Sequence, residues 1–237
     1  MIVTVASYNI HKAEGIDRRV DLGRIALVLK EIDADLVGVQ EVYRGQAEAL
    51  AATLGMSMAM GATRIHNDGQ PYGNAIFTRL SVHGSHTFDL TRPARQPRGG
   101  IRLDLLVGDG LLHLFNVHFG LKIRERAEQV KALLREQILN AELMGPRVVM
   151  GDLNEWFWFA GAVGRTLRRE LHGPRIRRTH PALLPLFPLD RIYWDRELHA
   201  EGFRVHRSRL ARVASDHLPV VARLRLPVAA GALAPGA

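Results

Sequence analysis

Arg147-Val-Val-Met-Gly-Asp-Leu-Asn154 is the stretch that decides the fold, because a short apolar run leads directly into two polar side chains. The apolar run predicts a buried strand over 147–150. Asp152 and Asn154 are separated by one residue, so in an extended segment both side chains point to the same side. Ligands of open α/β proteins bind where the strands end. The stretch therefore predicts a strand that delivers two polar groups to a binding site.

Polar residues placed directly after, or inside, an apolar strand recur along the chain. The segments that contain them are 8–11, 40–42, 73–76, 116–118, 189–192 and 215–217. One such segment carries little weight, because polar residues at strand ends are common. Several in one chain predict a single site to which many strands contribute.

Hydrophobic periodicity around these segments predicts mixed strands and helices. Strands are expected over 2–10, 36–40, 73–79, 82–88, 101–107, 111–117, 147–150, 189–194, 202–208 and 218–226, and helices over 22–32, 46–54, 122–140 and 159–171. Elements in this order favour an α/β sandwich in which sheets pack together under outer helices. We expect one domain over 1–226, followed by a flexible tail over 227–237 that has no periodic pattern.

The composition restricts the classes of protein and of site. The chain has 237 residues, 47% of them hydrophobic, which suits one domain with a large core. It has no cysteine, so any metal must be held by oxygen or imidazole. Neither a signal peptide nor an apolar stretch of transmembrane length is recognisable, and a cytoplasmic location is expected.

The charge balance is positive, at +8, with a pI of about 10.5. A positive field suits an anionic partner such as nucleic acid, a phospholipid surface or a phosphorylated metabolite. One arginine-rich stretch contains Arg165, Arg168, Arg169, Arg175, Arg177 and Arg178. These residues either contact an anionic polymer or membrane or form an ordinary surface. The charged residues Arg124, Glu125, Arg126 and Glu128 are expected on a solvated helix face.

The ordered set of polar segments resembles the endonuclease/exonuclease/phosphatase family, whose members are metal-dependent phosphoesterases with a deoxyribonuclease-I-like fold. The resemblance covers the chain from Tyr8 to about Leu226. It implies a four-layer α/β sandwich, with two packed mixed β-sheets flanked by helices. It also implies a Mg²⁺ or Mn²⁺ cofactor, an anionic phosphoester substrate and a monomeric state.

Phosphoester cleavage needs a cation and oriented donors, because negative charge accumulates on the phosphate and on the leaving oxygen. The resemblance places Glu41, Asn9 and Asp216 at the metal. Glu41 offers a hard oxygen ligand suited to Mg²⁺ or Mn²⁺, and Asn9 contributes directly or through a water. Taken alone, Glu41 could be an ordinary surface residue and Asn9 a turn residue that caps its own backbone.

The resemblance also implies how other residues act on the substrate. Asp152 is expected to activate the attacking water, and Asn154 to donate a hydrogen bond to the phosphate. His118 resembles the phosphate-contacting histidine of the deoxyribonuclease and sphingomyelinase branches. Asn74 matches a residue that shapes the substrate site, although it could instead be a core asparagine bonded to backbone.

His217 is placed against the scissile phosphate as a general acid/base or an electrostatic stabiliser, roles that suit an imidazole. Asp190 matches the family's carboxylate that orients this histidine. A structural pair between Asp190 and Arg191 is the competing interpretation. The prediction is thus a phosphoesterase, most simply one that cleaves phosphodiesters of nucleic acid or of a phospholipid head group. The alternative is a non-catalytic module on the same fold that binds nucleic acid or a membrane surface.

Overall fold

The computed structural model describes residues 1–66, 69–140, 142–157 and 161–227. The strands are β1 (Ile2–Asn9), β2 (Leu36–Tyr43), β3 (Ser57–Ile65), β4 (Pro71–Thr78), β5 (Val82–Asp89), β6 (Gly99–Val107), β7 (Gly110–His118), β8 (Arg147–Asp152), β9 (Asp190–Trp194), β10 (His199–Val205) and β11 (Val220–Arg225). The helices are α1 (Leu22–Ile32), α2 (Arg44–Leu54), α3 (Ile123–Ala132), α4 (Ala162–Glu170) and α5 (Ala211–Ala214), with a 3₁₀ turn η1 (His11–Ala13) and a π-helical turn η2 (Leu133–Ile138). The tail predicted over 227–237 lies, from residue 228 onward, outside the described residues.

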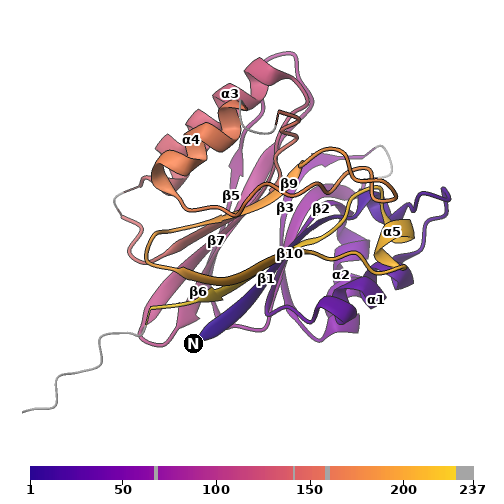
Figure 1. Cartoon of the computed structure of the whole chain (residues 1–237), viewed down its shortest axis with the longest axis horizontal. Coiled ribbons are helices and arrows are strands. Elements are labelled where there is room, and N and C mark those ends of the chain that lie inside the picture. The colour runs from indigo at the N-terminus through magenta and orange to yellow at the C-terminus, as the bar shows by residue number, and fades with distance from the viewer. Residues whose placement is uncertain (67–68, 141, 158–160, 228–237) are drawn as a thin grey trace, which may run out of the picture.

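Two mixed sheets pack face to face and carry helices on their outer faces (Figure 1). One sheet has the strand order β10-β11-β1-β2-β4-β3, and the other has the order β5-β6-β7-β8-β9. An aliphatic core fills the space between the sheets. Two further cores lie under α1, α2 and α5 on one side and under α3 and α4 on the other. This is the four-layer α/β sandwich that the sequence predicted.

The alternation of side chains along β7 shows how one strand serves two layers. Leu112 and Leu114 lie in the core between the sheets, whereas Phe115 and Val117 lie in the core under α3 and α4. Successive side chains of a strand point to opposite faces, and both faces are buried here. The strand is therefore apolar along most of its length, and its polar residues stand out.

A buried polar link joins the two sheets beneath their strand ends. The Gln40 side-chain amide donates to the Asn116 oxygen at 2.6 Å and to the Ser7 hydroxyl at 3.2 Å. Asn116 in turn donates to the backbone oxygens of Val39 and Ala75, both at 2.9 Å. Because these polar atoms are buried, pairing them fixes one relative placement of the sheets.

The strand β3 was missed by the sequence prediction. Its residues Ser-Met-Ala-Met-Gly-Ala-Thr-Arg-Ile include good helix formers and show no clear alternation. The segment lies at the edge of its sheet and pairs with β4 over most of its length. The segment forms a strand because it hydrogen-bonds to β4, and this pairing overrides the helix preference of its own residues.

The helix predicted over 122–140 is α3 followed by the π-helical turn η2. The prediction that its charged residues all face solvent was wrong. Glu125 and Arg126 are buried, not solvated. The Arg126 guanidinium donates to the Leu121 backbone oxygen at 2.6 Å and lies 3.7 Å from the Glu155 carboxylate. The arginine side chain is tolerated in the interior because backbone oxygens before α3 and the Glu155 carboxylate satisfy its charge. No helix in the described ranges is long and apolar enough to cross a membrane.

Candidate active site

Three of the predicted site residues lie side by side because their strands are adjacent. His118 ends β7, Asp152 ends the parallel strand β8, and the two residues are partners in the β-ladder. Asp152 is in turn the partner of Asp190, the first residue of antiparallel β9. The register of three strands thus places an imidazole and two carboxylates in one row. All three side chains are buried.

Asp190 binds His217 and not the neighbouring Arg191. The Asp190 Oδ2 atom lies 2.8 Å from His217 Nδ1 and also accepts a 2.5 Å hydrogen bond from the Thr179 hydroxyl. The Arg191 guanidinium instead donates to the Pro188 backbone oxygen at 3.1 Å and to the Tyr193 hydroxyl at 3.2 Å. The structural pair that competed with the orienting carboxylate is therefore not formed.

His217 sits between two carboxylates and carries a positive charge. Its Nε2 atom lies 3.8 Å from Asp152 Oδ2, on the side opposite Asp190. Burial acts to lower the pKa of His217, but the charges of Asp190, Asp152 and Asp216 outweigh it and raise this pKa to about 10. The imidazolium is thus a fixed cation and proton donor within the row of acids.

Asp152 is a desolvated carboxylate held by amide donors. Its Oδ1 accepts from the Asn154 backbone N–H at 2.9 Å, and its Oδ2 accepts from the Asn9 side chain at 3.0 Å. Burial is the main cause that raises the pKa of Asp152 to about 6. A carboxylate with this pKa is a stronger base than an exposed aspartate and is still ionised at neutral pH.

His118 and Asn154 meet at the edge of this carboxylate. The Asn154 side chain lies 3.2 Å from His118 Nε2 and donates to the Phe119 backbone oxygen at 2.9 Å. The Arg98 guanidinium lies 3.1 Å from both ring nitrogens of His118. Burial, helped by the charge of Arg98, holds the pKa of His118 well below its usual value. His118 is therefore favoured in its neutral form, in contrast to His217.

Glu41 is aimed at the site by a break in its strand. The pairing of β2 with β4 shifts register between Val39 and Val42, and Glu41 adopts a positive φ of 57°. A bulge of this kind re-aims a side chain. The Glu41 carboxylate accepts from the Tyr72 hydroxyl at 2.9 Å and from the Asn9 side chain at 3.3 Å. Nothing in the sequence singled out Tyr72 as a partner of this glutamate.

Asn9 links the two carboxylates. Its amide nitrogen donates to both Glu41 and Asp152, while its oxygen accepts from the His11 backbone N–H at 3.0 Å. Its backbone oxygen also accepts a 2.8 Å hydrogen bond from the Ser215 hydroxyl. Asn9 thus lies beside Glu41, as predicted, and in this arrangement it positions acids through its nitrogen.

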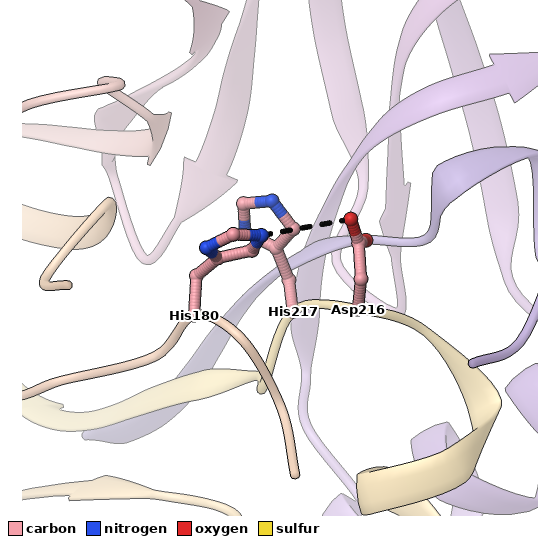
Figure 2. A group of neighbouring side chains, drawn as sticks. All are labelled: His180, Asp216 and His217. Atoms are coloured by element: carbon pink, nitrogen blue, oxygen red, sulfur yellow. Dashed lines mark ion pairs between the residues drawn. The ribbon is translucent and has the colours of Figure 1, made fainter. Parts of the chain in front are cut away.

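Asp216 stands on the more open side of the site with two histidines. The His11 Nδ1 and His180 Nε2 atoms each lie 3.7 Å from its carboxylate oxygens. Figure 2 shows the His180 ring beside that of His217, and the centroids of the two rings are 4.7 Å apart. Burial alone would raise the pKa of Asp216, but these histidines and His217 hold it well below its usual value. Sequence reasoning missed His180, whose loop carries no signal beyond its prolines.

Asn74 faces backbone as well as a cavity. Its amide donates to the Gly99 backbone oxygen at 2.9 Å, which matches the competing interpretation of a core asparagine. The residue nevertheless lines a cavity of about 130 Å³ together with Glu41, Arg98 and His118. A role in substrate binding stays a prediction.

The available donors suit a hard divalent cation. Among the described residues, two groups bring three metal-binding atoms together: His180, Asp216 and His217, and Asp152, Asp190 and His217. Glu41 belongs to neither group, although its carboxylate shares the Asn9 amide with Asp152. Carboxylate oxygens are the donors that a hard divalent cation prefers, and the chain has no thiolate to offer a softer one. The fold thus presents a buried Asp/His cluster with acidic groups at its mouth.

Comparison with known proteins agrees with this geometry. The model of the endonuclease/exonuclease/phosphatase family matches residues 6–217. The protein called "Uncharacterized protein YbhP" of Escherichia coli K12 is 27% identical over 246 residues, which cover 94% of this chain and 96% of that protein.

Solved structures are similar in fold at low sequence identity. A family member from Bacteroides thetaiotaomicron has a TM-score of 0.80 at 21% identity, with 96% of this chain and 99% of that chain covered. The mannosyl-6-phosphatase Bt3783 of the same species has a TM-score of 0.79 at 21% identity, with 94% and 100% covered. The human Nocturnin catalytic domain with a bound sulfate anion has a TM-score of 0.76 at 19% identity, with 95% and 94% covered.

Proposed function

The chain belongs to the endonuclease/exonuclease/phosphatase family, and on this premise we propose that it is a divalent-metal-dependent hydrolase of phosphodiesters. The observation that carries the proposal is the row formed by Asp190, His217 and Asp152. A charged imidazole is held at 2.8 Å by one buried carboxylate and faces a second one, whose pKa is raised to about 6. An acid and a base with separated pKa values then stand next to each other, as general acid–base catalysis requires.

In this mechanism Asp152 takes a proton from the attacking water. The Asn154 side chain and the His118 imidazole lie beside Asp152 and bind the phosphoryl oxygens. His217 is charged before the reaction begins, so it stabilises the additional negative charge of the transition state or protonates the leaving oxygen. Asp190 and Thr179 fix the orientation of His217 through the 2.8 and 2.5 Å hydrogen bonds.

Glu41 and Asp216, with Asn9 beside them, would hold Mg²⁺ or Mn²⁺. When bound, such an ion neutralises charge on the phosphate and on the leaving oxygen. The Tyr72 hydroxyl, 2.9 Å from Glu41, keeps one carboxylate oxygen oriented. Glu41 and Asp216 are both partly exposed, so an ion and a substrate can reach them from solvent.

The electrostatics favour an anionic substrate and catalysis over simple binding. The net charge of +8 attracts phosphoesters, including nucleic acid and phospholipid head groups. A non-catalytic module on this fold would bind anions through surface cations and would have no use for two desolvated aspartates. Burying ionisable groups lowers the stability of a protein, and such groups are concentrated at functional sites. This observation supports hydrolysis over the binding module.

The test is cleavage by purified protein in Mg²⁺ and then in Mn²⁺. The panel contains plasmid DNA, single-stranded RNA, phospholipid vesicles and bis-p-nitrophenyl phosphate. Asp152→Ala is expected to lose at least about 100-fold in turnover, and EDTA is expected to abolish turnover until Mg²⁺ is added back. Asp195→Ala is the matched control, because Asp195 is a partly buried carboxylate that binds Arg147 and contacts none of the site residues. Turnover that survives EDTA, or that Asp152→Ala leaves unchanged, would refute the proposed chemistry.

A further inference from the structure

The loop between α4 and β9 exposes a cluster of leucines. Leu183 is 60% exposed, Leu184 is 69% exposed and Leu186 is 46% exposed, all within four residues. The loop is a narrow hairpin, in which the Phe187 N–H donates to the His180 backbone oxygen at 2.8 Å and the His180 N–H donates back at 3.1 Å. In Figure 1 this orange loop leads into β9 and lies beside α5. We name residues 182–187 the leucine loop.

The leucine loop is fixed to the candidate active site. Thr179 and His180 precede it and contact Asp190 and His217. The Ala182 N–H donates to the Asp216 backbone oxygen at 2.7 Å. On the other side the Phe187 ring lies 4.7 Å from that of Trp156, which is itself partly exposed. The leucines therefore project from a firmly held base at the mouth of the site.

Arginines adjoin the base of the leucine loop on the α5 side. Residues 171–189 contain no Asp or Glu, although their exposed Arg175 and Arg177 line a separate pocket beside α4. Residues 202–215 also contain none, and their arginines reach the loop. Arg212 donates to the Leu183 backbone oxygen at 3.3 Å, and Arg207 donates to the Arg178 backbone oxygen at 3.4 Å.

This combination of side chains selects the kind of partner. Single exposed leucines are ordinary, but a cluster of them on a protruding loop marks an interaction surface. Arginines near an anionic bilayer are attracted by its surface potential, while aliphatic side chains enter the boundary of the acyl chains. Nucleic acid would satisfy the arginines but offers little apolar surface to cover three leucines. We propose that the leucine loop docks this protein onto an anionic phospholipid bilayer, with the adjoining Arg207 and Arg212 at the head groups.

The proposal concerns an interaction surface and does not depend on the proposed hydrolysis. Docking would hold the bilayer against the mouth of the site, because the base of the loop contacts Asp190, Asp216 and His217. It would be reversible and salt-dependent, since three side chains and a few charges give a weak anchor.

The test is flotation of the whole chain with vesicles of phosphatidylcholine, with and without one quarter phosphatidylglycerol. The wild type is expected to float with the anionic vesicles and not with the neutral ones. The triple variant Leu183→Ser/Leu184→Ser/Leu186→Ser is expected to lose at least tenfold in binding. The matched control Leu27→Ser/Val82→Ser/Leu106→Ser removes three other exposed apolar side chains and should bind as the wild type does. Thermal melts establish that both variants are folded.

Three outcomes would overturn the docking surface. The first is a wild type that does not float with anionic vesicles, and the second is a leucine variant that floats as well as the wild type. The third is a wild-type oligomer in gel filtration that becomes a monomer in the leucine variant, because a second copy would then cover the loop. Salt-sensitive binding to duplex DNA without any vesicle binding would assign the arginines to nucleic acid.

Discussion

Replacing Asp190 by asparagine removes the charge next to His217 while keeping the shape of the side chain. Asp190 Oδ2 accepts hydrogen bonds from both His217 and Thr179 in the buried row, and Asp190 makes the largest of the contributions that raise the pKa of His217 to about 10. Without that carboxylate, burial still lowers the pKa of His217, and less negative charge remains nearby to raise it. We therefore expect Asp190→Asn to lower the pKa of His217 toward its ordinary value.

The size of the effect on turnover follows from the protonated fraction. At pH 8 a histidine with a pKa of about 10 is essentially all protonated. A histidine with the ordinary pKa of ~6.5 is only ~3% protonated at that pH, which is a ~30-fold loss from charge alone. Lost orientation adds to this, because removing the carboxylate partner of a catalytic histidine costs up to about 10⁴-fold in hydrolases. We expect kcat to fall between about 30-fold and 10⁴-fold.

The assay is kcat against pH for Asp190→Asn, with circular dichroism to establish folding. Because the active form is the protonated one, turnover by the variant should fall as pH rises above about 6.5, whereas wild-type turnover should fall only near 10. Below pH 6 both should lose activity as Asp152 becomes protonated. The matched control is Asp104→Asn, which breaks another buried Asp–His pair, 2.6 Å from His113 Nδ1. If Asp190→Asn retained wild-type turnover at pH 8 while His217→Ala abolished it, the orienting role would be wrong.

Two further predictions concern the acids and the strands that position them. Tyr72→Phe removes the 2.9 Å hydrogen bond to Glu41, so the Mg²⁺ concentration for half-maximal turnover should rise several-fold while the free energy of unfolding stays the same. A Mg²⁺ titration of turnover measures this, and an unchanged titration would show that the hydroxyl does not orient the carboxylate. Gly151→Ala should lower the free energy of unfolding, measured by urea denaturation, by about 2–5 kcal/mol. Gly151 has a φ of 147°, and the added methyl group would collide with the Val117 backbone oxygen. A loss under about 1 kcal/mol would mean that β7 and β8 separate easily.

The sequence was sufficient to predict the fold class and most strands, because their apolar runs are buried on two faces. Strand β8 illustrates this, since Val148 and Met150 enter the core between the sheets while Val149 enters the outer core. The polar residue at the end of such a run is recognisable for the same reason. His118 and Asp152 were recognised in this way, whereas Asp190 was singled out by the family resemblance, and the structure brings all three into one row.

Other contacts of the site could not be predicted, because the residues that make them have no distinctive local sequence pattern. Tyr72 directly precedes one of the polar segments and Arg98 belongs to none, and neither was singled out, yet one binds Glu41 and the other lies against His118. His180 reaches Asp216 from a loop whose path is set by backbone hydrogen bonds to residues between α5 and β11, from the Ala182 N–H to the Asp216 oxygen and from the Leu218 N–H to the Thr179 oxygen. Arg126 was assigned to a solvated face because its neighbours alternate in charge. Each of these placements depends on tertiary partners far away in the sequence.

His118 and His217 show how two environments in one fold favour different protonation states of the same side chain. His118 is buried next to Arg98, and both burial and the neighbouring cation favour its neutral form. His217 is equally buried, but the carboxylates of Asp190 and Asp152 face its two nitrogens and keep it charged. Asp152 lies between the two imidazoles, 3.5 Å from His118 Nε2 and 3.8 Å from His217 Nε2, so it does not distinguish them. The distinction comes from Arg98 at His118 and from Asp190 at His217. A shift of β9 by one residue against β8 would turn Asp190 to the opposite face of the sheet. His217 would then lose its partner, and with it the charge that the proposed reaction uses.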